Sequence, residues 1–128
     1  MNFDANLSIL LVEDNELNQK LMKISLSRLN YKVTVAANGL EGVQMFNNQK
    51  FDIILMDIMM PVMDGFESTK MIRKIENENR DLGHIPIIAF TANTINNDRE
   101  KCIKGGMDDI LEKPFDILNF HKILSKLP

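Results

Sequence analysis

Five short apolar runs alternate with longer segments of helical periodicity along this 128-residue chain, and this alternation constrains the fold more than any other feature. Parallel strands need long crossover connections, usually helices, so the alternation predicts a parallel sheet with helices on both faces. Apolar residues make up 45% of the chain, enough for a packed core, and we predict one domain over residues 1–128 with its core at about 8–127. The predicted strands are residues 8–12, 32–36, 52–56, 86–90 and 109–112, and the predicted helices are residues 15–29, 39–48, 64–78, 96–104 and 116–126.

Charge and composition exclude several classes of protein. The net charge is −3 and the chain has no Lys/Arg-rich block, so direct nucleic-acid binding is not expected. No run of about 18 apolar residues occurs, so this segment is not expected to insert into a membrane. A single cysteine, Cys102, suits a reducing compartment and is interpreted as a small buried side chain. We expect a soluble, cytoplasmic protein.

The stretch ILMDIMMPVMDG, residues 54–65, ends an apolar strand on one aspartate, Asp57. A plain interpretation is that Asp57 caps the following turn, because aspartate is common where strands end. In a parallel sheet, however, ligands bind in the crevice beyond the carboxyl ends of the strands, and polar residues also follow the first, fourth and fifth predicted strands. The polar residues at this predicted edge are Glu13, Asp14, Asp57, Thr91 and Lys113.

Three carboxylates at one edge repel one another, and a hard divalent cation removes that conflict. Mg²⁺ prefers oxygen ligands and keeps several waters, so two or three carboxylates and one carbonyl suffice to hold it. With an ordinary pKa of about 4, Asp57 is expected to be ionised at pH 7 and to act as a nucleophile without a neighbouring base. The expected electrophile is a phosphoryl group, whose transfer is eased by a bridging metal, the Lys113 ammonium and the Thr91 hydroxyl.

Other reactive residues have structural interpretations. Asp64 has capping-box spacing to Glu67, so we prefer helix capping over a fourth metal ligand for its side chain. His84 and His121 are far apart in sequence and have no partner at ligand spacing, so both are interpreted as surface or loop histidines.

The stretches LLVEDNELNQ, MDIMMPVMDG, FTA and EKPF occur in the order and spacing seen in receiver domains of two-component response regulators, and the resemblance covers Ser8 to Leu127. It implies a five-stranded sheet in strand order 2-1-3-4-5, which is the flavodoxin-like, doubly wound arrangement. It also implies that Asp57 accepts a phosphoryl group from a histidine, with Mg²⁺ as cofactor. By the same resemblance the metal ligands are Glu13, Asp14, Asp57 and the backbone carbonyl of Met59, the switch hydroxyl is Thr91, and the invariant cation is Lys113.

Three details refine the resemblance. The stretches VEDNELNQ and CIKGGMDDILEKPF look most like receivers attached to hybrid sensor histidine kinases, which implies a histidine kinase or a histidine phosphotransfer protein as partner. Receivers commonly carry Tyr or Phe three residues before the lysine, where this chain has Ile110, so the usual ring flip coupled to Thr91 is not available. The resemblance also implies a cis Lys113–Pro114 bond, which would aim the ammonium inward from the strand end.

Two other functions stay open at this point. An aspartate-nucleophile phosphatase also places Asp beside Mg²⁺ at a strand end, but such enzymes generally carry a second Asp two residues later, where this chain has Met59. A receiver-like binding module that never receives phosphate is the third option, and the intact set of site residues speaks against it. We therefore predict a signalling phosphoacceptor and not a turnover enzyme.

The first predicted helix gives the expected docking site. At about 100° per residue, Leu17 and Ile24 project away from the core side of this helix, with Leu21 at the border. Histidine-bearing helical bundles dock on this helix in the resembling family, so we predict that Leu17 and Ile24 form part of an apolar docking patch. The alternative is that both are incidental surface side chains. The predicted core side of the helix consists of Asn18, Met22, Ser25, Leu26 and Leu29.

Overall fold

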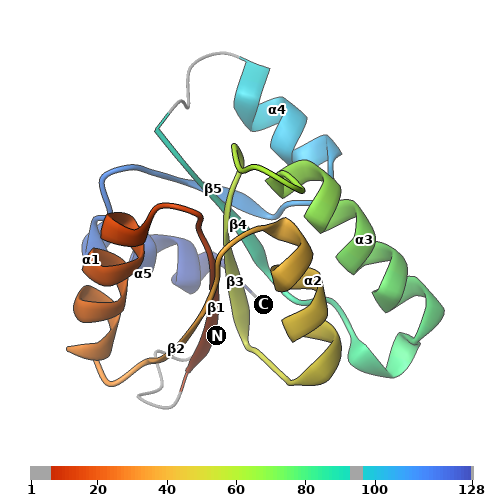
Figure 1. The fold of residues 1–128 in the computed structure, drawn as a ribbon, viewed down its shortest axis with the longest axis horizontal. Coiled ribbons are helices and arrows are strands. Elements are labelled where there is room, and N and C mark those ends of the chain that lie inside the picture. Colours follow the sequence, from red (N-terminus) through yellow and green to blue (C-terminus); the bar gives the residue numbers. More distant parts are fainter. Residues whose placement is uncertain (1–6, 93–96, 128) are drawn as a thin grey trace.

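Five parallel strands form one sheet with helices on both faces in the computed structural model, which describes residues 7–92 and 97–127. The strands are β1 (Ser8–Val12), β2 (Lys32–Ala36), β3 (Ile53–Asp57), β4 (Ile87–Thr91) and β5 (Asp109–Glu112), and the helices are α1 (Glu16–Ser27), α2 (Gly39–Asn48), α3 (Gly65–Glu78), α4 (Asn97–Lys104) and α5 (Ile117–Lys126), with a 3-10 turn at Arg80–Leu82. The strand order is β2-β1-β3-β4-β5. Figure 1 shows α1 and α5 on one face of the sheet and α2, α3 and α4 on the other. The predicted doubly wound fold and its strand order are confirmed.

Two strands begin and end one residue later than the sequence predicts. Asp57 belongs to β3, because it pairs with Phe90 in the ladder between β3 and β4. Asp52 lies just before β3, and its carboxylate accepts a hydrogen bond from the Ser8 N–H at 2.7 Å. The first helix ends at Ser27 instead of residue 29. Residue 96, the predicted start of the fourth helix, lies outside the described residues.

Two apolar layers, one on each face of the sheet, bury β3 and β4 along their whole length. Successive side chains of a strand point to opposite faces, so each central strand contributes to both layers. The layer under α1 and α5 contains Ile9, Leu11, Met22, Leu26, Leu55, Phe120 and Leu124. The layer under α2, α3 and α4 contains Leu10, Val43, Ile54, Met56, Ile72 and Cys102. Helices cover both faces of the sheet, so polar side chains that bind a ligand can lie only at the ends of the strands.

The side of α1 that meets the sheet is narrower than predicted. Met22 and Leu26 are buried, whereas Ser25 is exposed, so its assignment to the core side is wrong. The helix covers the sheet with one row of side chains spaced four residues apart, and Ser25 falls outside that row. The exposure predicted for the opposite side is confirmed. Its apolar residues Leu17 and Ile24 are 64% and 53% exposed, and Leu21, predicted at the border, is 54% exposed.

The two histidines take part in polar contacts that the sequence did not indicate. His84 is an exposed loop residue, as predicted, but its Nε2 lies 2.7 Å from the carboxylate of Asp108. The same carboxylate pairs with the Arg73 guanidinium at 2.9 Å. His121 is half-buried on α5, and its Nε2 lies 3.0 Å from the Tyr31 hydroxyl, so its interpretation as a surface or loop residue is wrong. These contacts join segments that are distant in sequence, which no local pattern predicts.

Candidate functional site

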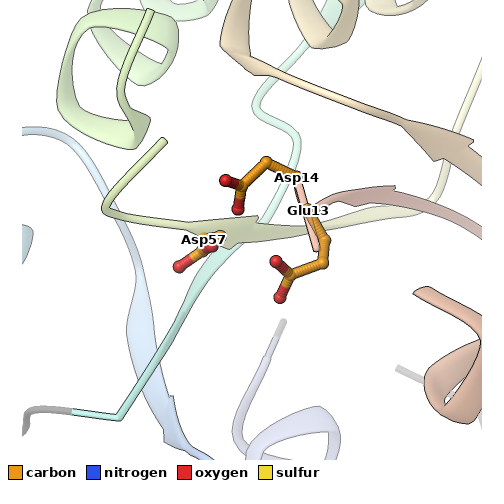
Figure 2. Close-up of side chains that lie close together, drawn as sticks. All are labelled: Glu13, Asp14 and Asp57. Atoms are coloured by element: carbon orange, nitrogen blue, oxygen red, sulfur yellow. The ribbon is translucent and has the colours of Figure 1, made fainter. Parts of the chain in front are cut away.

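The carboxyl ends of β1 and β3 bring three carboxylates together. Glu13 and Asp14 follow β1 directly, Asp57 ends β3, and one oxygen from each lies within 4.8 Å of the others. Figure 2 shows these side chains converging at the edge of the sheet. Glu13 and Asp57 are buried, while Asp14 is exposed to solvent. Hard oxygen donors that repel one another and face solvent on one side suit a hydrated divalent cation such as Mg²⁺.

The first turn of α1 holds Glu13 in place. The Asn15 N–H donates to the Glu13 carboxylate at 3.1 Å, and the Gln19 side-chain amide donates to the Glu13 carbonyl at 2.6 Å. Asn15 is also the N-cap of α1, since its side chain accepts a hydrogen bond from the Asn18 N–H at 2.9 Å. The sequence analysis gave Asn15 and Gln19 no role. Asparagine before a helical pattern is an N-cap signal that indicates the first of them.

The loop after β3 fixes the backbone of Asp57 against the start of α3. The Gly65 N–H donates to the Ile58 carbonyl at 2.8 Å, and a Cβ atom at Gly65 would collide with the Asp57 carbonyl. Only glycine permits this close approach of the two segments. Asp64 accepts a hydrogen bond from the Glu67 N–H at 2.9 Å and caps α3. The capping prediction for Asp64 is therefore confirmed.

Lys113 reaches into the acidic group from the end of β5. Its ammonium lies 3.0 Å from a Glu13 oxygen and 3.5 Å from an Asp57 oxygen. It also lies 5.2 Å from the centre of the Phe90 ring, and the Lys113 N–H donates to the Thr91 carbonyl at 2.8 Å. The Lys113–Pro114 bond is cis, as the resemblance implied. The ammonium is thus the cation of this site.

The remaining predicted residues lie at the same edge of the sheet. Thr91 is buried at the end of β4, one position beyond the residue that pairs with Asp57. Met59 follows Asp57 by two residues, and its side chain is 80% exposed. Ile110 is half-buried on β5 and packs into the apolar layer under α2, α3 and α4. An aliphatic side chain therefore occupies the position at which receivers commonly carry an aromatic ring.

Burial raises the pKa of Asp57 from an ordinary value of 3.8 to about 7, and the negative charge of Glu13 adds to this effect. The Lys113 ammonium acts in the opposite direction but does not cancel it. Burial also raises the pKa of Glu13, but the Asn15 N–H and Lys113 outweigh burial, so that pKa lies below its ordinary value. The expectation that Asp57 is ionised at pH 7 therefore holds only in part for the metal-free site, where the side chain is partly protonated. Burial, together with repulsion from Glu13, makes Asp57 the group that keeps the proton.

The sequence of this chain matches the model of one known protein family. The family model of the response regulator receiver domain matches residues 9–125, which includes every site residue described above. The chain belongs to the receiver domain family. The resemblance drawn from its motifs is thereby confirmed.

Known receivers of histidine kinases resemble this receiver closely. Hybrid signal transduction histidine kinase I of Dictyostelium discoideum is 39% identical over 123 residues, which cover 91% of this chain but only 7% of the kinase. The chain thus spans a small part of the curated relative that it matches. None of the helices within residues 7–92 and 97–127 is long and apolar enough to cross a membrane.

Solved structures include receivers described with a metal and with a partner. The receiver domain of sensor histidine kinase PA1611 from Pseudomonas aeruginosa carries a magnesium ion in its active-site cleft. It is 43% identical to this chain with a TM-score of 0.82, and the match covers 94% of this chain and 96% of that one. The receiver of Saccharomyces cerevisiae Ssk1, crystallised with the histidine phosphotransfer protein Ypd1, is 30% identical with a TM-score of 0.85; the match covers 91% of this chain and 85% of that one.

Proposed function

We propose that this receiver accepts a phosphoryl group from a phosphohistidine onto Asp57 in the presence of Mg²⁺. The observation that carries this proposal is the meeting of three carboxylates within 4.8 Å beside an ammonium that contacts two of them. Membership of the receiver family supports it, as does the magnesium ion described for the Pseudomonas aeruginosa receiver.

Each residue of the site has a distinct role in this proposal. The carboxylates of Glu13, Asp14 and Asp57 and the carbonyl of Met59 would hold Mg²⁺. When bound, the ion neutralises charge on the phosphoryl oxygens and on the crowded carboxylates. Thr91 would donate its hydroxyl to one phosphoryl oxygen and the Lys113 ammonium would pair with another. The distance of 3.5 Å between the Lys113 ammonium and an Asp57 oxygen supports this role.

The transfer itself needs Asp57 in its ionised form. A carboxylate oxygen attacks the phosphorus, a P–O bond forms, the P–N bond to the donor imidazole breaks, and the imidazole leaves with the electron pair of that bond. The raised pKa of Asp57 means that the metal-free side chain is only partly ionised at neutral pH. A cation bound among the carboxylates favours the ionised form, so metal binding and readiness for transfer are coupled.

Intact mass measurement after incubation with Mg²⁺ and acetyl phosphate tests the proposal. We expect a labile phosphoryl adduct on the wild type and none on Asp57→Asn, because the amide is not a nucleophile. Asp64→Asn is the matched control, since asparagine also caps helices and the adduct should persist. Turnover of acetyl phosphate without an adduct would favour the phosphatase alternative, and no change in the wild type would favour the binding module.

We further propose that the donor is a histidine kinase or a histidine phosphotransfer protein and that it docks on the α1 patch, defined as Leu17, Leu21 and Ile24. All three side chains are more than half exposed on the helix that starts at the acidic group. The complex of the Ssk1 receiver with Ypd1 supports this class of partner.

We also propose that the protein is a signalling phosphoacceptor and not a turnover enzyme, that it is located in the cytoplasm, and that it does not bind nucleic acid directly. The receiver family supports the first assignment, the single buried cysteine supports the second, and the net charge of −3 supports the third.

The substitutions Leu17→Ser and Ile24→Ser test the α1 patch. Both should slow phosphotransfer from the histidine protein while labelling by acetyl phosphate stays at the wild-type rate. Leu82→Ser is the control, because Leu82 is 44% exposed in the 3-10 turn, far along the chain from α1. Equal slowing with both donors, or no slowing with either, would show that these side chains do not form the docking surface.

A further inference from the structure

The ring of Phe90 is a neighbour of the Lys113 ammonium that carries no charge. The ammonium lies 5.2 Å from the centre of this ring, within the distance of about 6 Å at which the face of an aromatic ring attracts a cation. Phe90 is buried and directly precedes Thr91 at the end of β4. Because the attraction between a cation and a ring grows when water is excluded, a buried ring holds the ammonium more strongly than an exposed ring would.

The register of the sheet places this ring on the same side as the acceptor. Phe90 pairs with Asp57 in the ladder between β3 and β4, and residues paired across a ladder point to the same face of the sheet. Phe90 also pairs with Leu111 on β5, two residues before Lys113, so the lysine returns to that face as well. The acceptor carboxylate, the ring and the ammonium therefore meet on one face of the sheet.

Neighbouring aromatic rings hold Phe90 in this orientation. The Phe115 ring meets it nearly edge-on, with centroids 6.4 Å apart and an angle of 75° between the ring planes. The centroid of Phe120 in turn lies 5.6 Å from that of Phe115. Aromatic pairs favour such arrangements, in which the edge of one ring meets the face of another. Phe115 follows Lys113 by two residues, so the segment that carries the ammonium also packs against the ring that attracts it.

The ring differs from the carboxylates in how it responds to Mg²⁺. In the metal-free site Glu13 and Asp57 hold the ammonium at 3.0 and 3.5 Å. In the proposed function both carboxylates bind Mg²⁺, whose positive charge offsets their attraction for the ammonium and repels the ammonium itself. An uncharged ring offers Mg²⁺ no oxygen ligand, so its attraction for the ammonium remains. The ring is thus the contact that keeps this cation in the site until a phosphoryl oxygen arrives.

We propose that Phe90 is a positioning residue for phosphoryl transfer, because its ring face holds the Lys113 ammonium beside Asp57 when Mg²⁺ neutralises the carboxylates. This inference rests on the proposed function and adds a residue to which that proposal gives no role. Phe90 acts through Lys113 and not on the phosphoryl group itself. The Lys113 side chain is 20% exposed, so without the ring the ammonium can turn toward solvent and leave the phosphoryl oxygen without its cation.

Two changes at Phe90 separate the attraction of the ring from its packing. Phe90→Leu removes the ring, whereas pentafluorophenylalanine introduced at this position keeps the shape of the ring but withdraws electrons from its face, which then repels a cation. With Mg²⁺ and acetyl phosphate we expect both proteins to be labelled about tenfold more slowly than the wild type, which corresponds to about 1.4 kcal/mol. Phe120→Leu is the matched control, since it removes a buried ring from the same apolar layer. It should lower the melting temperature but leave the labelling rate unchanged.

Proton NMR of Lys113 gives a measurement that does not depend on transfer. The face of an aromatic ring shields nuclei above it, so the Lys113 Hε protons of the wild type should resonate upfield of those of exposed lysines. We expect this upfield shift to persist when Mg²⁺ is added. Phe90→Leu should abolish the shift, and Phe120→Leu should retain it.

Several outcomes would overturn the inference, each in a different way. Wild-type labelling of the pentafluorophenylalanine protein beside slow labelling of Phe90→Leu would show that the ring acts by packing alone. Wild-type rates in both, or equal slowing in Phe120→Leu, would show that Phe90 has no specific role in transfer. Loss of the Lys113 shift on addition of Mg²⁺ would show that the ring does not hold the ammonium in the loaded site. A wild type that acquires no adduct would instead refute the proposed function, and the positioning role with it, whatever the NMR shift.

Discussion

Replacing Asp57 with asparagine should stabilise the metal-free receiver above neutral pH. Burial and the charge of Glu13 raise the pKa of Asp57, so the folded protein binds its proton more tightly than the unfolded chain does. The stability that a carboxyl group with a raised pKa contributes to the fold is fully present at low pH. It is lost as the pH rises from about 4 to about 7. Asparagine has no proton to lose, so the variant should keep its stability over this range.

The structure sets the size of this effect. The difference between the ordinary pKa of 3.8 and the value of about 7 corresponds to about 4 kcal/mol, at about 1.4 kcal/mol for each pH unit. The side chain is only 8% exposed, so solvent screens the effect weakly. Relaxation of the site reduces it, and we expect Asp57→Asn to unfold with a free energy about 2–4 kcal/mol above that of the wild type at pH 8. At about pH 4.5 the two proteins should differ much less.

Urea unfolding in EDTA at several pH values between 4.5 and 8.5 measures this difference. The pKa of Glu13 is lowered, so the stability that Glu13 contributes is lost only as the pH falls below the ordinary carboxyl range. Glu13 therefore does not contribute to the change in the free energy of unfolding above pH 5. Glu78→Gln, an exposed carboxylate at the far end of α3, is the control and should follow the wild type. A stability difference that is the same at every pH, or a wild type that gains stability between pH 5 and pH 8, would refute the reasoning.

Three further substitutions probe the same site. Asp14→Ala should weaken the stabilisation by Mg²⁺, which reaches about 2.7 kcal/mol at one hundred times Kd in the wild type, as measured by thermal melts with and without the ion. Gly65→Ala should destabilise the fold by about 2 kcal/mol and slow acetyl phosphate labelling, because the new methyl group displaces the Asp57 carbonyl. Urea midpoints equal to those of the wild type would contradict this. Lys113→Met should cost about 3 kcal/mol in urea unfolding, because it leaves the buried Glu13 carboxylate without its cation; a variant as stable as the wild type would show that this pair is dispensable.

The polar residues that follow the apolar runs and the helix caps were the most predictable features of this protein, because their signals are local in sequence. The run Ile53–Met56 followed by Asp57, and the capping pair Asp64 and Glu67, each show their structure within a few residues. The same reasoning missed Ser25, because periodicity gives the direction of a side chain but not the width of the surface that the helix covers.

Properties that depend on distant groups could not be obtained from sequence alone. The pKa of Asp57 depends on its burial and on the distance to Glu13, neither of which a motif contains. The contact between Arg73 and Asp108 joins α3 to the segment before β5, and neither residue has a local signal for the other. Val62 is similar, since its left-handed backbone is set by the loop and not by any preference of valine.

The turn Glu13–Asp14–Asn15 has a practical consequence for any exchange of α1 between receivers. This turn follows β1 directly, and its three residues supply two carboxylates and cap α1. Gln19 on the first helical turn donates back to the Glu13 carbonyl. A chimera in which α1 is exchanged from Asn15 onward would therefore replace the proposed α1 patch and disturb the acidic group at once. Grafting only from Lys20 onward keeps both hydrogen bonds to Glu13 but leaves the native Leu17 in place. The proposed α1 patch can be varied without disturbing the acidic group only side chain by side chain, and not by exchanging the whole helix.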